Sequence, residues 1–288
     1  MTPTLLSIGH GYCARALALV LQPRGWRIIG TTRSAHKAAA MLHDGIEPLI
    51  WPGTDLTVAL GAATYLLTSV APGAAGDPVL AAHANEIAAC KHLKWLGYLS
   101  TTGVYGNHGG DWVDETAPLN PATQRGAARV LAEAAWTGLC NQAGLPLHIF
   151  RLAGIYGPGR GPFEKVRDGT ARRILKPGQV FSRTHVEDVA QVLAASIARP
   201  NPGAIYNVCD DDPAPPEDVI ACAAALLGLP LPPAVDYDRA EMTAMARSFY
   251  AESKRVRNHR IKQELGVVLR YPDYRFGLAA LLRAETNG

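Results

Sequence analysis

Short apolar runs alternate with longer segments of helical periodicity through the first two thirds of the chain. The apolar runs predict strands at residues 5–8, 27–31, 47–51, 64–68, 95–100 and 147–152, and a further run lies at 204–208. Helical patterns between them include residues 14–21, 80–92 and 127–142. Continuously apolar strands separated by helices are typical of a parallel sheet covered on both faces. The pattern therefore predicts a doubly wound α/β fold.

The composition of the chain changes after about residue 158. Proline and glycine, which interrupt regular structure, cluster at residues 157–162, 199–203, 212–216 and 227–234. We therefore expect a first domain at residues 1–158 and a mixed region at residues 159–288. This second region would return to the sheet at about residues 180–210 and then form a small, irregular C-terminal lobe for a substrate.

Charge and cysteine content exclude several classes of function. The net charge is +3 and no lysine- or arginine-rich block is present, so no nucleic-acid partner is expected. The five cysteines are scattered singly and the N-terminus lacks a basic leader, which indicates reduced thiols and a cytoplasmic location. No apolar run is long enough to predict a membrane span. Asp210, Asp211 and Asp212 have no spaced histidine beside them, so no metal site is expected.

A glycine-rich segment follows the first predicted strand directly. Residues 9–14 read G-x-G-x-x-A and open the first predicted helix. In this pattern Gly9 allows a tight turn, Gly11 lets the backbone approach a pyrophosphate, and Ala14 lets helix and strand pack closely. The phosphates would lie on the free N–H groups at the start of the helix. We therefore expect residues 1–158 to form a Rossmann-type NAD(P)-binding domain, with cofactor contacts from Gly9, His10, Gly11, Tyr12, Cys13 and Ala14.

The residues after the second predicted strand bear on the choice between NADP(H) and NAD(H). An acidic residue here would bind the ribose 2′-hydroxyl of NAD, but the chain reads Thr32-Arg33-Ser34. The guanidinium of Arg33 suits a 2′-phosphate and the hydroxyls can add hydrogen bonds. NADP(H) is favoured, and a solvated start of the second helix is the alternative. The loop after the fourth predicted strand can line the same cleft, which makes Ser69 and Pro72 further candidate contacts.

Three further segments resemble motifs of the extended short-chain dehydrogenase/reductase family, which includes sugar-nucleotide epimerases and dehydratases. Residues 99–106 read LSTTGVYG, residues 150–159 read FRLAGIYGPG, and residues 184–190 read THVEDVA. They are similar to the family's S-[ST]-x-x-V-Y-G, R-x-x-x-x-Y-G-P-G and H-V-x-D-[VL]-A motifs and follow the same order. Together with the glycine-rich loop, the resemblance covers residues 4–208 and implies an NAD(P)-dependent, epimerase/dehydratase-like protein.

The chain departs from the family at its catalytic pair. Where the resemblance places the Y-x-x-x-K motif, counted back from Glu133, Arg125 replaces the tyrosine and Arg129 replaces the lysine. Arginine stays protonated near neutral pH, so neither can relay a proton, although either can bind an anion. Thr101 matches the family's catalytic serine or threonine, and Tyr105 is a nearby phenol. Thr101, Tyr105, Arg125 and Arg129 are the candidate catalytic residues.

Substrate recognition also departs from the family's epimerases. Their phosphate-binding arginine corresponds to Phe181 here, and Arg183 lies out of register. The basic segment at residues 254–262 favours a solvated helix face, and the alternative is that its arginines face an anionic substrate.

These features predict an atypical extended short-chain dehydrogenase/reductase. We expect an NADP(H)-dependent oxidoreductase or epimerase that acts on a small polar or anionic metabolite, with Thr101 orienting the substrate oxygen. The proton would come from Tyr105, Tyr156, His185, the substrate or water. A non-catalytic NADP(H)-binding sensor or regulatory protein is the alternative, supported by the two arginines. A homodimer is a further expectation, because many members of the family pair through two helices.

Overall fold

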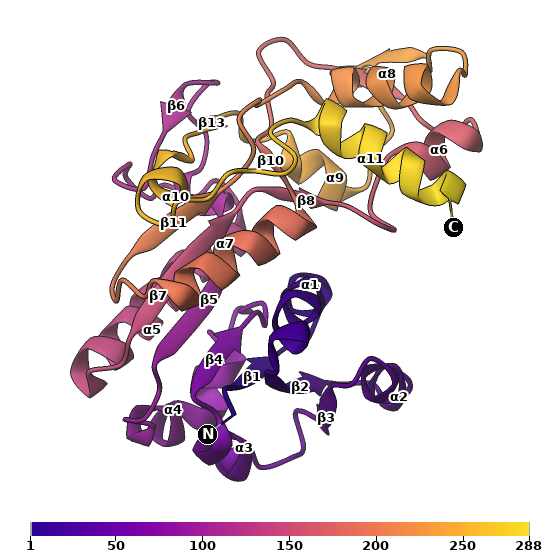
Figure 1. Ribbon diagram of the computed structural model, residues 1–288. Helices are drawn as coiled ribbons and strands as arrows, with labels where there is room; N and C mark the ends of the chain where they lie inside the picture. The colour runs from indigo at the N-terminus through magenta and orange to yellow at the C-terminus, as the bar shows by residue number, and fades with distance from the viewer. Residues whose placement is uncertain (1, 288) are drawn as a thin grey trace.

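The computed structural model describes residues 2–287 and is built on one sheet of seven parallel strands (Figure 1). These strands are β1 (Thr4–Ile8), β2 (Arg27–Thr32), β3 (Glu47–Ile50), β4 (Tyr65–Thr68), β5 (Trp95–Thr101), β7 (Leu147–Leu152) and β11 (Ile205–Val208). Their order across the sheet is β11-β7-β5-β4-β1-β2-β3. Each of the seven apolar runs in the sequence forms one of these strands, so the predicted doubly wound α/β fold of Rossmann type is confirmed.

Helices cover both faces of this sheet. One core contains buried side chains of α1 (Tyr12–Leu21) and α7 (Val186–Ala198), together with Met41 of α2 (Ala35–His43). The opposite core contains those of α3 (Thr57–Ala62), α4 (Pro78–Ala89) and α5 (Gln124–Ala143). Both faces of the strands other than the edge strand β3 are therefore largely removed from water. This burial explains why these strands read as continuous apolar runs.

Capping residues set the helix ends where the apolar pattern alone did not. The carboxylate of Asp77 accepts hydrogen bonds from the N–H groups of Val79 and Leu80, so α4 begins before the predicted residue 80. Thr123 caps α5 in the same way through the N–H of Gly126 at 3.1 Å, ahead of the predicted residue 127. Caps lie outside the periodic apolar positions, so periodicity locates a helix but underestimates its first turn.

The connection between β3 and β4 creates the point where ligands bind in this class of fold. The chain runs from β1 outward through β2 to β3, and then crosses to β4 on the other side of β1. The loops that follow β1 and β4 therefore leave the same edge of the sheet in opposite directions. The residues of these loops include the glycine-rich segment and Ser69–Pro72.

The remaining elements lie at the end of the sheet near α7 and continue past it (Figure 1). Three pairs of short strands occur here: β6 (Trp112–Val113) with β13 (Arg255–Val256), β8 (Gly154–Tyr156) with β10 (Arg183–His185), and β9 (Arg173–Leu175) with β12 (Ala234–Asp236). The other elements of this region are α6 (Phe163–Arg167), α8 (Pro216–Leu227), α9 (Ala244–Phe249), α10 (His259–Gln263), α11 (Tyr274–Asn287), η2 (Thr102–Tyr105) and η3 (Tyr237–Arg239). The short helix η1 (Gln22–Arg24) lies elsewhere, between α1 and β2.

A second, smaller core joins α6, α8 and α11, which Figure 1 shows grouped together. Residues after 158 also return to the sheet, because α7 packs on its face and β11 forms its edge. The division into domains at residue 158 stays a prediction. The basic segment at residues 254–262 is not one solvated helix: it forms β13 and part of α10, and Ile261 is fully buried.

Three further observations concern residues 2–287. None of the helices is both long and apolar enough to cross a membrane. All five cysteines are free thiols. Within the described part of the chain, no group of three or more histidine, cysteine or acidic side chains is arranged to hold a metal ion.

Candidate functional site

The loop after β1 requires glycine at its first position. Gly9 has a φ of +81°, and a Cβ atom there would lie 2.8 Å from Cγ2 of Val70. The N–H of Gly9 donates to the hydroxyl of Thr31 at 2.8 Å, which fixes the turn against the end of β2. The close approach and the left-handed backbone together leave no room for a side chain.

The helix that follows presents an uncapped N-terminus. Gly11 is the N-cap of α1, no side chain accepts its free N–H groups, and the first turn holds no acidic residue. Gly11 is also exposed. Free N–H groups and the positive end of the helix dipole together bind anions. The residues present therefore fit the pyrophosphate of a dinucleotide.

The side chains of this loop have different surroundings. Cys13 and Ala14 are buried in the core, so they contribute close packing of α1, and burial raises the pKa of the Cys13 thiol to about 11. His10 packs beside Gly30, and burial, the largest cause, lowers the pKa of its imidazole to about 4. The phenol of Tyr12 donates to the carbonyl of Pro158 at 2.9 Å. The loop can therefore contact a cofactor mainly through its backbone.

The end of β2 carries one exposed cation. Ser34 caps α2 by accepting from the N–H of Lys37 at 3.3 Å, and Thr32 accepts from the N–H of Ser34 at 3.3 Å. Both hydroxyls keep a proton to donate. Arg33 lies between them, is exposed, and is available to an external anion.

The segment after β4 joins the glycine-rich loop to a large cavity. The hydroxyl of Ser69 donates to the carbonyl of Gly9, and Val70 packs against the same glycine. Ala71 and Pro72, the next two residues, line the cavity. A ligand on the glycine-rich loop and a ligand in the cavity would therefore share this segment.

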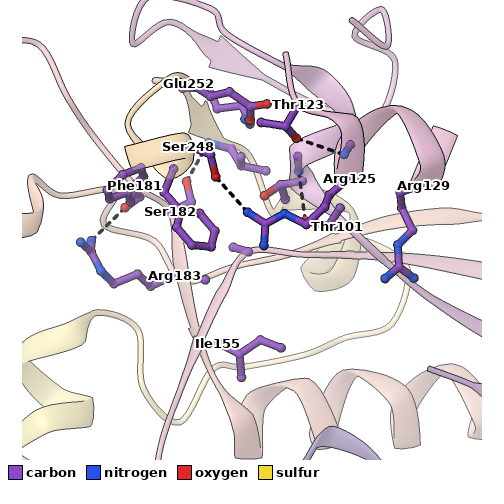
Figure 2. Close-up of a pocket in the computed structure, with 18 of the residues that line it drawn as sticks. Thr101, Thr123, Arg125, Arg129, Ile155, Phe181, Ser182, Arg183, Ser248 and Glu252 are labelled. Atoms are coloured by element: carbon purple, nitrogen blue, oxygen red, sulfur yellow. Dashed lines mark hydrogen bonds and ion pairs between the residues drawn. The ribbon is translucent and has the colours of Figure 1, made fainter. Parts of the chain in front are cut away.

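The cavity has a volume of about 770 Å³ and lies between the sheet edge and the C-terminal elements (Figure 2). Its walls come from the end of β5, the start of α5, β8, the segment that leads into β10, α9 and the segment that leads into β13. Its charged lining residues are Arg125, Arg129, Arg183, Lys254 and Glu252. Four cations against one carboxylate favour an anionic ligand.

Thr101 ends β5 at the wall of this cavity. Its hydroxyl oxygen accepts from the N–H of Gly103 at 3.1 Å, a bond that starts η2. The hydroxyl proton remains free to donate to a ligand. The predicted role of Thr101 beside a substrate oxygen stays a prediction.

The two arginines that the sequence motif places at the family's Tyr-Lys positions have different contacts. Arg125 reaches across the cavity, donates to the hydroxyl of Ser248 at 3.0 Å and lies 5.0 Å from the ring centre of Phe249 (Figure 2). Arg129 turns toward the sheet, where it donates to the carbonyl of Leu99 at 2.6 Å and to the phenol of Tyr98 at 3.1 Å. Of the pair, Arg125 therefore extends across the cavity and Arg129 is held against the sheet.

The three side chains that the sequence offers as proton donors are held in the protein interior. Tyr105 is fully buried, does not line the cavity, and its hydroxyl donates to Asn207 at 2.7 Å. His185 is 1% exposed and caps α7 through its Nδ1 atom. Tyr156 lines the cavity, but burial, with nearby carboxylates, raises the pKa of its phenol far above the ordinary value. None of the three is placed as a ready donor.

Tyr105 instead belongs to a buried polar network under the cavity. Arg151 donates to its hydroxyl at 2.9 Å and forms a 2.8 Å ion pair with Glu133. Ser100 donates to the same carboxylate. Arg151 of β7 and Glu133 of α5 therefore fix β5, β7 and α5 relative to one another.

The C-terminal elements contribute cavity residues that no motif in the sequence indicated. Ser248 and Phe249 of α9, and Glu252 and Lys254 before β13, line the cavity. Arg255, Arg257 and Arg260, which the sequence offered as alternatives, do not line it. The alternation of Lys254, Arg255 and Val256 is a weak strand signal, and it could have shown that Lys254 and Val256 share one side.

Comparisons with known proteins agree with this geometry. The model of the NAD-dependent epimerase/dehydratase family matches residues 8–209. The protein YeeZ of Escherichia coli strain K12 is 33% identical over 284 residues, which cover 92% of this chain and 95% of YeeZ.

Two solved structures are similar to this fold over nearly the whole chain. A functionally unknown conserved protein from Silicibacter pomeroyi is 63% identical, with a TM-score of 0.94 over 98% of this chain and 99% of that one. The UDP-glucuronic acid 4-epimerase of Bacillus cereus in complex with NAD has a TM-score of 0.79 over 99% of each chain. At 14% identity, this second likeness shows the fold alone.

Proposed function

The chain belongs to the NAD-dependent epimerase/dehydratase family, an extended short-chain dehydrogenase/reductase group, and from this membership we propose that it is an NADP(H)-dependent oxidoreductase acting on a small anionic metabolite. The observation that carries the proposal is the segment Ser69–Pro72, which touches the glycine-rich loop and lines the cavity. It lets one continuous site hold a dinucleotide and a substrate side by side.

The cofactor would be held by the backbone of the loop after β1. The N–H groups at the start of α1 would take the pyrophosphate, and Gly9 leaves the space that a Cβ atom would fill. When bound, the dinucleotide supplies hydride chemistry, and the protein positions the substrate for it.

The preference for NADP(H) rests on Arg33. The segment from Gly30 to Ser34 contains no acidic residue to bind a ribose 2′-hydroxyl. Arg33 is exposed at the start of α2 with a hydroxyl on each side. This arrangement suits a 2′-phosphate.

The charges of the cavity support an anionic substrate. Arg125 enters from α5 and Arg183 from β10, so cations stand on different walls. Thr101 would donate a hydrogen bond from its hydroxyl to the reacting oxygen. A carboxylate or phosphate of the substrate would lie toward Arg125, in the position where other members of the family carry tyrosine.

A cytoplasmic location and a homodimer belong to the same proposal. The free thiols of all five cysteines support a reducing compartment. Leu131 on α5 is 69% exposed, and an apolar side chain at such a position supports pairing through that helix.

Substrate-dependent oxidation of the reduced cofactor tests the proposed function. The protein is mixed with NADPH or NADH and a panel of 2-oxo acids and phosphorylated aldehydes and ketones, and nucleotide absorbance is followed. We expect turnover of at least one anionic carbonyl compound, faster with NADPH. If nucleotide binds but no compound is reduced, the catalytic proposal fails and a binding or regulatory role is favoured instead.

A further inference from the structure

We propose that Lys254 is the proton donor of this site and takes the part that the missing tyrosine plays elsewhere in the family. This inference rests on the proposed oxidoreductase function. It concerns a residue from the C-terminal segment, outside every motif that marks the family in the sequence.

The backbone around Lys254 is fixed on both sides. The N–H of Ser253 donates to the side-chain oxygen of Asn107 at 2.9 Å, and its hydroxyl donates to the carbonyl of Gly178 at 2.8 Å. On the other side, the N–H of Val256 donates to the hydroxyl of Ser182 at 3.0 Å. Lys254 is only 8% exposed, and it still lines the cavity. Its side chain is therefore held at the wall rather than free in solvent.

The ammonium group keeps one N–H for a ligand. Nζ of Lys254 donates to the carbonyl of Gly106 at 2.8 Å and to the carboxylate of Glu252 at 2.6 Å. An ammonium has three donors, so these partners leave one. Gly106 directly follows η2, and Thr101 directly precedes it. The ammonium is thus tied to the same turn that positions the Thr101 hydroxyl.

The electrostatic surroundings make this lysine a better acid than an exposed one. Burial lowers the pKa of Lys254, and the contact with Glu252 offsets part of that effect. The cationic Arg125 and Arg129 of α5 and Arg183 of β10 line the same cavity. Glu252 also accepts from the N–H of Ala122 at 3.3 Å, which holds the carboxylate in place.

The other cavity residues with a titratable side chain are poorer donors. Burial, the first cause in each case, raises the pKa of Tyr156 and of Tyr250. Arg125 and Arg129 cannot give up a proton near neutral pH. Among the described residues that line the cavity, Lys254 is the one lysine. Lys254 is therefore the cavity residue best suited to donate the proton in place of the missing tyrosine.

In the reducing direction, Lys254 would give its proton to the oxygen of a carbonyl substrate. A bound reduced nicotinamide would supply the hydride for the new C–H bond and would itself be oxidised, so that the carbonyl electron pair would move to the oxygen that Lys254 protonates. The Nζ–H bond of Lys254 breaks as the O–H bond forms, which yields an alcohol and a neutral amine. Solvent returns a proton to the amine beside Glu252. In the oxidising direction the neutral amine takes the hydroxyl proton.

The test compares three lysine variants with the wild type. Lys254→Met removes the donor, Lys254→Arg keeps the positive charge without a transferable proton, and Lys262→Met is the matched control, because Lys262 pairs with Asp211 outside the cavity. The probe is the carbonyl acid that the wild type reduces fastest. NADPH dissociation constants and circular dichroism spectra verify that each variant is folded.

We expect kcat to fall by about 100-fold or more in both Lys254 variants, because general acid catalysis contributes on this order. NADPH affinity and the Lys262→Met rates stay unchanged. The wild-type kcat declines as pH rises through the Lys254 pKa, and Glu252→Gln moves that decline to lower pH. Competitive acetylation of the lysines, measured by mass spectrometry, reports the Lys254 pKa without requiring turnover. It should show the same shift to lower pH in Glu252→Gln.

Two results would overturn the inference, and they are distinguishable. Wild-type turnover with an unchanged rate in Lys254→Met, or full rescue by Lys254→Arg, removes Lys254 as the donor and leaves the proposed function standing. A wild type that reduces no carbonyl compound contradicts the proposed function and the inference together.

Discussion

The guanidinium of Arg125 donates a hydrogen bond to the hydroxyl of Ser248 at 3.0 Å and ties α5 to α9 across the cavity. The arginine also lies over the ring of Phe249, 5.0 Å from its centre. The position that the sequence motif equates with the family's tyrosine thus holds a positive charge, which contacts α9 of the C-terminal elements. An arginine at this position, held in the cavity by α9, supports the anionic substrate that we propose.

Replacing Arg125 by alanine tests that link. Loss of a hydrogen bond to a charged partner costs about 1.5–3 kcal/mol, so KM for the anionic substrate is expected to rise about tenfold or more. The affinity for NADPH stays the same. Arg239→Ala, which removes an exposed arginine of η3 outside the cavity, is the control. Equal KM values for Arg125→Ala and the wild type contradict the assignment.

Alanine variants of Gly9 and Gly25 distinguish exclusion of a side chain by neighbouring atoms from strain in the backbone. Gly9 has a φ of +81° and a close neighbour at 2.8 Å, whereas Gly25 has a φ of +78° and no heavy atom within 4 Å of the place that a Cβ atom would take. Strain costs about 1–3 kcal/mol in both alanine variants. Only Gly9→Ala is expected to lose NADPH binding, as measured by fluorescence titration. Intact binding in Gly9→Ala would show that the loop tolerates a side chain.

The hydroxyl of Thr101 is expected to matter for turnover beyond its structural bond. Thr101→Ala and Thr123→Ala each delete a hydroxyl that accepts an N–H bond at 3.1 Å at the cavity wall. Each loses about 1 kcal/mol of stability. Only Thr101→Ala should lose turnover, by about 100-fold, and Thr101→Ser should recover it. Similar kcat values for Thr101→Ala and Thr123→Ala would contradict the role of Thr101.

Asp210 makes the stability of the protein depend on pH. It is 2% exposed, and burial raises the pKa of its carboxyl to about 8, with Arg183 opposing the shift. The folded-state pKa therefore lies above the unfolded value of 3.8. The stabilisation from the protonated carboxyl is complete below pH 4 and is lost as pH rises toward 8.

Asp210→Asn removes this titration. Urea unfolding of the variant and the wild type at pH 5 and pH 8 measures the difference in unfolding free energy. The difference should move in favour of the variant as pH rises, by at most about 1.4 kcal/mol per pH unit. A difference that is the same at both pH values would show that the carboxyl ionises normally.

Most of the main sheet could be predicted from the sequence because its strands, apart from the partly exposed edge strand β3, are buried on both faces. Leu5 and Leu6, for example, are neighbours on opposite faces of β1, and both are fully buried. Such strands are continuous apolar runs. The two-residue strands β6 and β13 have no such signal, because their pairing depends on side-chain contacts made far away in the sequence.

Some residues of the candidate site could likewise be predicted from the sequence, and others could not. The glycine-rich loop could be predicted because Gly9 and the uncapped start of α1 are local requirements within one turn. Lys254 could not, because its place at the cavity depends on Gly106 and Asn107, which lie about half the chain away. Tyr105 looked like a candidate in its motif, but the network with Arg151 and Asn207 holds it in the core.

The measurement that tests the proposed cofactor site most directly is the affinity for NADPH and NADH, by fluorescence titration, in the wild type, Arg33→Ala and Arg24→Ala. Arg24 is also exposed and lies on η1, away from the end of β2. We predict tighter binding of NADPH than of NADH, and a loss of about tenfold or more for NADPH alone in Arg33→Ala. Tighter binding of NADH in the wild type would contradict the cofactor preference. Failure to bind either nucleotide would contradict the proposed function as a whole.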